Sequence, residues 1–361
     1  MVIEETGLPH GVMEGKGAYN RHAAIPARGA ALATPFLEQA VRKVALDPVD
    51  QPVVIADYGS SQGKNSLAPM QIAIRNLRER TGPSRPIFVF HVDQPSNDFN
   101  SLCGVLSSDP DRYAVNGAPV FPCLVGRSFY EQVLPRGSVH LGWSSFAAQW
   151  LHRVPSLVPD HFFPLFSTGA ARAAFERQAA EDWKAFLSLR AYEMRPGARL
   201  VIVMPTLPDG GISGFAELMN HANAVLREMA DEGAITGEER ARMVLGVYAR
   251  RKEELLAPFA SDGEFEGLAV EACDLSELPD RDWADYQSDR DKEALATKHA
   301  LFIRAVFMPS LASALSRAQD GDGEAQRSFA DRLEDGLVRR LIIHPTGADM
   351  FVHTIVLAKA G

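Results

Sequence analysis

The chain of 361 residues has few cysteines, no long apolar run and fewer basic than acidic side chains. Its three cysteines, Cys103, Cys123 and Cys273, lie far apart and lack the spacing of a disulfide framework or a metal site, so we expect them to be buried as small apolar residues. The net charge is −9, from 37 basic and 46 acidic residues. This disfavours a nucleic-acid partner, because phosphate binding usually needs a basic patch, but it does not exclude a small acidic substrate.

Three further absences narrow the class of protein. No apolar run reaches the roughly 18–20 residues that a membrane span requires, and no basic start precedes an apolar core, so we expect a cytoplasmic protein without a membrane partner. The ten histidines form no close pair with metal-ligand spacing, so we expect structural histidines and no metal centre. Because there is no Gly-x-Ser-x-Gly motif, a hydrolase would lack a nucleophile.

What the sequence does contain is an alternation of apolar runs and helical periodicity. Apolar runs at 53–56, 87–92 and 199–205 predict buried strands, while 65–80 and 170–194 predict helices. Strands that alternate with helices imply an α/β fold with a mostly parallel, doubly wound sheet.

Several other segments predict local structure. Residues 1–30 show no clear period and predict an irregular arm. Residues 138–143 predict a short strand, and 144–154 a helix that follows it. Residues 337–344 and 350–360 are β-rich and separated by a turn, which favours an antiparallel pair at the edge of the sheet.

A second region is expected to cover the sheet. Apolar stripes at helical spacing predict helices in 211–256 and 292–318, and the acidic stretch between them predicts loops in 259–291. We therefore expect a mainly helical cap, residues 211–327, packed on the carboxyl edge of a sheet domain formed by 1–210 and 328–361.

The most informative stretch is VVIADYGSSQGKNSL, at 53–67, which predicts a strand, a glycine turn and a helix N-terminus. In open α/β sheets this is where adenosine-containing ligands bind. The loop lacks both the Gly-x-Gly-x-x-Gly fingerprint and the end of a P-loop, since Asn65 follows Lys64, and Asp57 would repel a pyrophosphate. S-adenosylmethionine fits better because it has an ammonium group and no phosphate. A structural turn without a ligand is the alternative.

Asp93 ends the second apolar strand. At that position a carboxylate can accept hydrogen bonds from both ribose hydroxyls of an adenosine. A helix cap or a turn acid explains the same residue equally well.

The segment SSFAAQW carries the candidate substrate contacts. On the predicted helix, Phe146, Gln149 and Trp150 lie on neighbouring turns and share one face. Trp and Gln side chains can donate hydrogen bonds from an apolar wall, which suits a carboxylate. An ordinary core helix with an aromatic anchor gives the same pattern.

Together and in order, these segments resemble the SABATH family of S-adenosylmethionine-dependent carboxyl methyltransferases, some of whose members methylate nitrogen, and this chain resembles a divergent, microbial type. The resemblance covers nearly the whole chain and implies a Rossmann-like fold with an α-helical cap, an S-adenosylmethionine cofactor, a small carboxylic acid substrate and a homodimer. It rests on four blocks: GKGAYNRHAAIP (15–26), IADYGSSQGKNSL (55–67), VDQPSNDFNSL (92–102) and GRSFYEQVLPRGSVHLGWSSFAAQWLHRVP (126–155).

The resemblance also implies site residues. In the family, a Gln of the N-terminal arm and the Trp of the last block hold the substrate carboxylate; Trp150 is present here, but Pro26 replaces the arm Gln. His22 and Phe146 also differ from the residues that the family has at these positions. Because Pro26 cannot donate the hydrogen bond of the arm Gln, Gln149 or His22 would supply it instead. The cofactor contacts implied are Tyr19, Asp57, Gly59, Asn65, Asp93, Gln94, Ser128, Phe129 and Ser144. Further substrate-wall positions, all apolar, are Leu218, Met219, Ile303, Val306 and Phe351.

The resulting hypothesis is direct, in-line transfer of a methyl group to the carboxylate of a lipophilic or aromatic acid, with Trp150 and Gln149 aiming the reacting oxygen. A carboxylate is ionised at neutral pH, so no general base is required, and orientation supplies the rate. N-methylation of a heterocycle is the alternative within enzymes. A sensor that binds S-adenosylmethionine without turnover is the alternative of another class.

Overall fold

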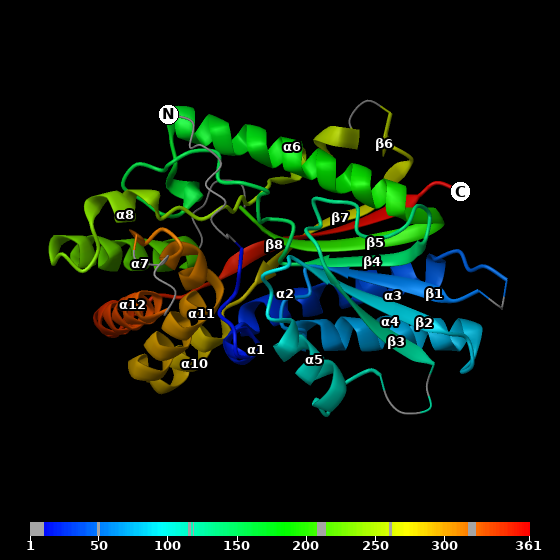
Figure 1. Cartoon of the computed structure of the whole chain (residues 1–361), viewed down its shortest axis with the longest axis horizontal. Helices are drawn as coiled ribbons and strands as arrows, with labels where there is room; N and C mark the ends of the chain where they lie inside the picture. Colours follow the sequence, from blue (N-terminus) through cyan, green and yellow to red (C-terminus); the bar gives the residue numbers. More distant parts are fainter. Residues whose placement is uncertain are drawn as a thin grey trace.

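The computed structural model describes residues 11–48, 51–114, 117, 119–207, 214–259, 262–316 and 323–361. In that part of the chain, eight strands form one sheet in the order β3-β2-β1-β4-β5-β8-β7-β6 (Figure 1). Five neighbouring strands run parallel: β1 (Val53–Tyr58), β2 (Ile87–Asp93), β3 (Val120–Gly126), β4 (Val139–Ser145) and β5 (Met194–Thr206). The other three are antiparallel: β8 (Met350–Lys359), β7 (Leu268–Leu278) and β6 (Glu264–Phe265). The predicted α/β fold with a mostly parallel sheet is confirmed.

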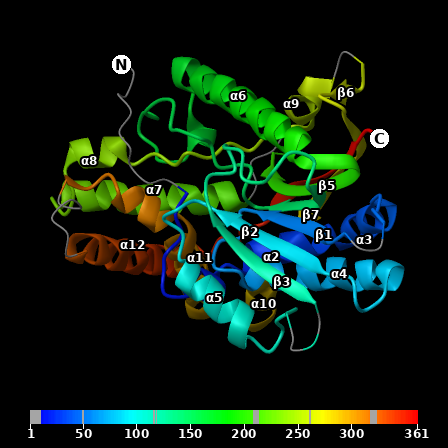
Figure 2. The same ribbon diagram turned by 45° about the vertical axis from the view of Figure 1, so that its right-hand side comes forward.

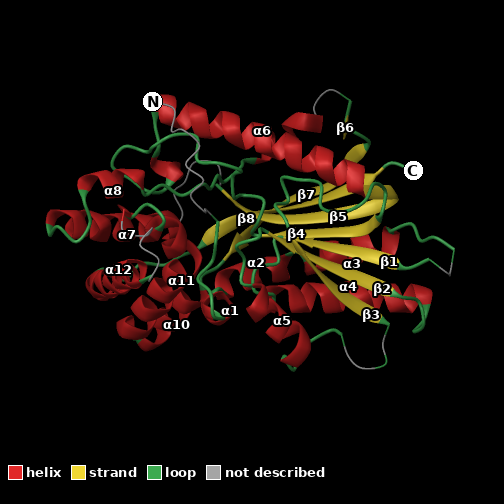
Figure 3. Cartoon of the chain, in the orientation of Figure 1, coloured by secondary structure: helices red, strands yellow, loops and turns green. Residues whose placement is uncertain are grey.

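Helices cover both faces of this sheet (Figure 3). On one face, α6 (Gly169–Glu193) buries Trp183, Phe186 and Leu187 against apolar side chains of the strands. The opposite face is covered by α2 (Ala24–Leu32), α3 (Thr34–Lys43) and α4 (Lys64–Thr81). The short α5 (Phe99–Ser108) follows β2. This two-sided cover buries most side chains of β1, β2, β4 and β5, while the edge strand β3 stays largely exposed, and it leaves the loops at the carboxyl ends of the strands free to build a site.

A mainly helical cap lies at one end of the sheet (Figure 2). In the cap, α11 packs along α12, and α12 packs on α7. The close approach of α12 to α7 requires Gly336, where a Cβ would lie 2.4 Å from Val225. The cap helices are α7 (Gly214–Asp231), α8 (Gly237–Arg242), α10 (Arg281–Asp289), α11 (Lys292–Ala312) and α12 (Glu324–Ile343). None of the helices in the described ranges is both long and apolar enough to cross a bilayer.

The boundary between cap and sheet differs from the sequence prediction at two places. Residues 259–291 were expected to be loops, but β6, β7 and α10 (Arg281–Asp289) lie within them. β7 pairs with β8 from Leu268 to Leu278. Only these two terminal side chains of β7 are buried, and the side chains between them are half-buried or exposed, so the sequence lacks the apolar alternation that predicts a strand. Residues 264–278 therefore belong to the sheet.

The predicted strand at 337–344 is wrong, because these residues form the last turns of α12, which packs with the cap. Leu337 and Leu341 are buried one helical turn apart, with Arg339 and Arg340 between them, so the spacing is that of a helix. β8 pairs instead with β5 and β7, and it is a central strand of the sheet.

Two further expectations near the N-terminus and β4 are corrected. The arm is not irregular throughout, since α1 (Ala18–His22) and α2 lie within it. Residues 144–154 do not form a helix: β4 runs to Ser145, Phe146 turns the chain with a φ of 52°, and Trp150 makes an isolated antiparallel bridge with Val247.

The expectation that the three cysteines are buried is also corrected, because Cys103 is exposed and the other two are half-buried.

Candidate functional site

The loops that follow β1, β2, β3 and β4 converge on one cavity of about 260 Å³ at the carboxyl edge of the parallel strands. We call it the polar cavity because amide, hydroxyl and carboxylate groups line it. Six of the predicted cofactor residues lie on its wall: Tyr19, Gly59, Asp93, Gln94, Ser128 and Phe129. Residues 11–13 of the N-terminal arm line one side of the polar cavity. A hydrogen bond from Gln94 Nε2 to the carbonyl of Gly11, at 2.8 Å, holds the arm there.

A smaller inner pocket lies beside the polar cavity, and Asp57 and Asn65 line it together with Tyr19. One carboxylate oxygen of Asp57 accepts a hydrogen bond from Ser66 Oγ at 2.5 Å and lies 2.9 Å from His91 Nδ1. The ring is fixed from its other side, where His91 Nε2 lies 2.6 Å from the hydroxyl of Tyr113. This chain of contacts holds Asp57 in one orientation and leaves its second oxygen for a ligand. Sequence reasoning did not find the role of His91, which lies within an apolar strand.

The glycine loop between β1 and α4 is shaped for a closely bound ligand. Gly59 has a φ of 93°, and a Cβ at this position would lie 2.2 Å from the Cβ of Ala147. The hydroxyls of Ser60 and Ser61 and the side-chain oxygen of Gln62 are buried without a hydrogen-bond partner. Buried polar groups are normally satisfied, and Ser60 and Ser61 line the inner pocket, so their two hydroxyls fit a polar ligand there.

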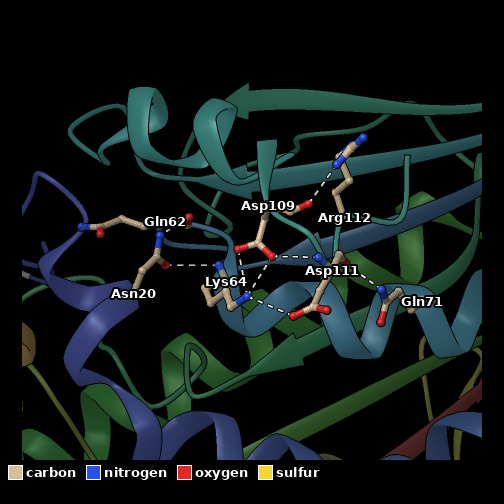
Figure 4. A network of polar contacts seen from close by, with 7 residues as sticks. All are labelled: Asn20, Gln62, Lys64, Gln71, Asp109, Asp111 and Arg112. Atoms are coloured by element: carbon tan, nitrogen blue, oxygen red, sulfur yellow. Dashed lines mark hydrogen bonds and ion pairs between the residues drawn. The ribbon is translucent and has the colours of Figure 1, made fainter. Parts of the chain in front are cut away.

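The cation in this loop serves the protein and not a phosphate (Figure 4). Lys64 Nζ lies 2.9 and 2.8 Å from the two carboxylate oxygens of Asp109 and 3.3 Å from Asp111. The backbone N–H of Lys64 donates to Asn20 Oδ1, and Asn20 Nδ2 donates to the carbonyl of Gln62. The arm is thus tied to the end of the loop that leads into α4, and the ammonium that a P-loop would use is already paired.

Asp93 lies between the polar cavity and the glycine loop. Its carboxylate accepts hydrogen bonds from the backbone N–H groups of Ser61 at 2.7 Å and Gln94 at 2.8 Å. Burial raises the pKa of Asp93 to about 6, and the nearby charge of Asp57 acts in the same direction. Asp93 therefore changes its charge within the range of pH used for enzyme assays.

With the role that the family resemblance implies for Asp93, the ionised carboxylate would accept charge-assisted bonds from the ribose hydroxyls of S-adenosylmethionine. We therefore expect the affinity for this cofactor to rise about tenfold between pH 5 and pH 7, as the pH passes the raised pKa of about 6. Calorimetric titrations over that range measure the effect. Asp93→Asn is the control and should give a weaker, flat profile. An equally steep profile in Asp93→Asn would assign the pH dependence to another group.

A second cavity, which we call the apolar cavity, opens from the same place toward the cap. Met13, Tyr19, Phe146 and Trp150 line both cavities and so mark the junction between them. The wall combines predicted residues with a larger set that the sequence did not reveal: Phe163, Pro164, Leu165, Pro205, Leu207, Phe215, Val247, Phe302, Phe307 and Met350. Of these missed residues, only those of the aromatic run at 162–166 stand together in the sequence and could have been noticed there. The others come from separate elements that meet only in the fold.

Trp150 is the predicted substrate contact with the clearest position. Its side chain is 8% exposed, and the ring packs on Phe307. Gln149 is on the wall of the apolar cavity, where its Nε2 donates to the carbonyl of Phe146 at 2.8 Å while its Oε1 is enclosed without a partner. Pro26 lines the apolar cavity and the inner pocket.

The remaining predicted residues lie away from the described cavities, except for Val306, which lines the apolar cavity. His22, on α1, is half-buried, and burial lowers its pKa. Ser144 is buried, and its Oγ donates to the carbonyl of Tyr58 at 2.9 Å. Four of the predicted wall positions lie in the core or on β8 and are not part of the cavity wall: Leu218, Met219, Ile303 and Phe351.

One cluster of possible metal ligands occurs in the described ranges, outside both cavities: Asp280, Asp282 and His299. Basic side chains already neutralise it, with Lys298 Nζ 2.9 Å and Arg28 3.5 Å from Asp282. Asp280 also accepts a hydrogen bond from the backbone N–H of Ala348 at 2.8 Å. The cluster therefore joins the cap to the loop before β8.

Comparison with known proteins places this site in a family. Residues 10–338 match the family model described as SAM dependent carboxyl methyltransferase. The chain is 32% identical to a probable S-adenosylmethionine-dependent methyltransferase of Arabidopsis thaliana, At5g38100, over 84% of each chain. It is 26% identical to gibberellic acid methyltransferase 2 of the same plant over 72% of each. The match to methyltransferase LUC1 of Fusarium, 31% identical, covers 67% of this chain but only 65% of the length of that protein.

A solved structure shows the same fold. The loganic acid methyltransferase solved with S-adenosylhomocysteine superposes with a TM-score of 0.75, at 23% sequence identity, over 97% of this chain and 99% of the other. At this identity the match supports the fold, and the roles of individual side chains must be argued from the geometry above.

Proposed function

The chain belongs to the S-adenosylmethionine-dependent carboxyl methyltransferase family, and from this membership we propose that it methylates the carboxylate of a small lipophilic acid. The observation that carries the proposal is the junction of two cavities of opposite character. The polar cavity and the inner pocket are lined by two carboxylates and by hydroxyls without a partner among the described residues, and a cavity with a mainly apolar wall opens beside them. Trp150 lies on the wall of both.

The polar side fits the cofactor of the family. Asp57, with one oxygen held by Ser66 and His91, would bind the ammonium group, and Asp93 would accept from the ribose hydroxyls. The backbone of Gly59 lines both the polar cavity and the inner pocket, and the absence of a Cβ lets the loop pack against Ala147 beside them. When bound, S-adenosylmethionine supplies an electrophilic methyl group that an ionised carboxylate accepts without a general base.

The chain's part in the reaction is to orient the acid and to exclude water. The indole N–H of Trp150 has no hydrogen-bond partner in the described part of the chain, although the side chain is almost fully buried at the junction. It is therefore available to donate to one oxygen of the carboxylate. We assign the second donor to the remaining N–H of Gln149, because the other candidate, His22, lines neither cavity.

The apolar wall and the similarity to gibberellic acid methyltransferase 2 both support a lipophilic acid as substrate. N-methylation of a heterocycle is the second candidate, favoured by the replacement of the arm Gln by Pro26, which cannot donate. A non-catalytic sensor is the third, but an unpartnered indole N–H at a cavity junction has no purpose in a protein that binds only the cofactor.

Incubation with methyl-labelled S-adenosylmethionine and a panel of aromatic acids, fatty acids and heterocycles separates the three functions. Label in base-labile esters is the result that we expect. Label that withstands base and remains on a heterocycle nitrogen would replace the proposal with N-methylation. Saturable cofactor binding without transfer to any compound of the panel would favour the sensor.

We also propose a cytoplasmic homodimer, as the family resemblance implies. An aromatic face on the edge of the sheet supports the dimer: Phe121 of the edge strand β3 is 47% exposed and stacks on Phe88 at 5.3 Å, and Phe88 stacks on Phe90. Exposed aromatic patches are typical of interaction surfaces.

Light scattering of the wild-type protein should give twice the mass of one chain, and Phe121→Glu should give one chain with an unchanged circular dichroism spectrum, because a charge on this face cannot be buried without a partner. Tyr192→Glu, at an equally exposed aromatic residue on α6, is the control and should remain dimeric. A monomeric wild-type protein, or a dimeric Phe121→Glu, would remove the proposed interface.

A further inference from the structure

Arg172 is the only charged side chain on the wall of the apolar cavity within the described ranges. It lies near the start of α6, and its side chain is 27% exposed. It does not line the polar cavity, and Tyr248 lies between it and Gln149, because the Tyr248 ring contacts Arg172 while the Tyr248 backbone bonds to Gln149. Methyl transfer to a carboxylate does not require this cation for activation, because the carboxylate is already ionised at neutral pH.

The guanidinium is held in one orientation by contacts of Nε and Nη2, the latter donating to the hydroxyl of Tyr248 at 3.5 Å, which leaves the Nη1 group as a donor toward other partners. Its Nε donates to Glu176 Oε1 at 2.7 Å, and its plane lies over the ring of Tyr248 at 5.5 Å. The hydroxyl of Tyr248 donates in turn to Glu254 at 2.6 Å. None of the described residues accepts a hydrogen bond from Nη1 of Arg172. This donor group is therefore preorganised for a ligand in the cavity.

The surface around Tyr248 links this end of the cavity to the reacting end. The backbone N–H of Tyr248 donates to the carbonyl of Gln149 at 2.9 Å, and Val247 forms the bridge with Trp150. Side chains of residues 247–249 therefore form a continuous wall from the indole to the guanidinium. A single elongated molecule can contact both ends.

The local charges select the kind of group that Arg172 binds. Glu176 and Glu254 both act on Arg172, and two carboxylates against one guanidinium leave a net negative charge. A second carboxylate on the substrate would be repelled there, whereas an uncharged oxygen gains a charge-assisted hydrogen bond. An ordinary i,i+4 ion pair on the helix surface would explain the contact between Arg172 and Glu176. It would not explain why the guanidinium lies over the ring of Tyr248 and lines the apolar cavity.

We propose that Arg172 is a specificity-determining residue that binds an uncharged oxygen, a hydroxyl or carbonyl, at the end of the acid remote from the methylated carboxylate. The proposal rests on the proposed carboxyl methylation, and it narrows the substrate to elongated monoacids with an oxygen function at the far end.

The test compares straight-chain fatty acids with ω-hydroxy acids and ω-dicarboxylic acids of matching lengths, using wild-type enzyme, Arg172→Met and Arg177→Met. At the length that spans the cavity, we expect the wild type to have a KM about tenfold or more lower for the ω-hydroxy acid than for the fatty acid, with similar kcat. Arg172→Met keeps the aliphatic contact with Tyr248 and should abolish this preference. Arg177, exposed on the same helix, is the control and should retain it.

Glu176→Gln provides an independent check, because removal of its charge should raise the affinity for ω-dicarboxylic acids. Calorimetric binding of the acids in the presence of S-adenosylhomocysteine gives the same comparison without turnover. If the wild type methylates fatty and ω-hydroxy acids with equal KM, or if Arg172→Met keeps the preference, the inference is wrong while the carboxyl methylation stands. If no acid of any series is bound or methylated, the proposed function itself fails.

Discussion

Replacing Trp150 by Phe is expected to lower kcat/KM for the acid substrate by about ten- to a hundredfold, while the dissociation constant of S-adenosylmethionine changes little. The substitution removes the indole N–H and keeps an aromatic ring against Phe307. A hydrogen bond to a charged group contributes about 1.5–3 kcal/mol, which corresponds to that range of rates. If the bond is strongest when the oxygen is aimed at the methyl group, kcat carries most of the loss.

Initial rates with labelled cofactor and calorimetric cofactor titrations measure the two quantities separately. Trp283→Phe, on α10 and outside both cavities, is the matched control and should show normal kinetics. Trp150→Ala should lose more than Trp150→Phe and also weaken cofactor binding, because the arm packs on the indole near Gly11. Unchanged turnover in Trp150→Phe would exclude the indole as the donor that aims the carboxylate.

The cofactor half of the site could be predicted from the sequence, because its residues follow directly after predicted strands. Asp57, Gly59 and Asp93 follow directly after strands, and the carboxyl ends of parallel strands meet at one edge, so their proximity could be predicted. The sheet class followed from the same alternation of strands and helices.

The acceptor half could be predicted less well, because it is built by residues that meet only in the tertiary structure. Phe163, Phe215 and Phe302 come from a loop and two cap helices, and no spacing along the chain links them. The segment that bears Trp150 has the apolar periodicity of a helix, yet the positive φ of Phe146 and the bridge to Val247 impose a turn. Tertiary contacts there outweigh local propensity.

A similar limit explains the errors at the sheet edge. β7 was hidden because its side chains are largely polar and half-exposed, so only its pairing with β8 identifies it as a strand. Residues 337–344 were misread because a short apolar run fits a strand and a buried helix equally well until its neighbours are known.

Replacing Gly59 by Ala is expected to abolish cofactor binding in calorimetric titrations and to lower the free energy of unfolding by about 2–5 kcal/mol. Two costs add up: an L-residue at a φ of 93° is strained by about 1–2 kcal/mol, and the new methyl group would lie 2.2 Å from Ala147, an overlap that typically costs about 1–3 kcal/mol. Relief of that overlap must move either the glycine loop or residues 146–150, which carry Trp150, so both halves of the site are disturbed together.

Two further variants isolate the free-energy cost of the overlap between the new methyl group and Ala147. Gly137→Ala carries a positive φ of 61° with open space around the new methyl group, so denaturant unfolding should show only the backbone strain, with normal cofactor binding. In Gly59→Ala/Ala147→Gly the colliding methyl group is absent, and the double variant should recover stability and part of the cofactor affinity, with a coupling energy of about 0.5–3 kcal/mol in a double-mutant cycle. Additive losses in that cycle would show that the loop and the segment bearing Trp150 are not in contact. Ala147, which lines the polar cavity directly after the junction residue Phe146, would then not couple the glycine loop to the segment that carries Trp150.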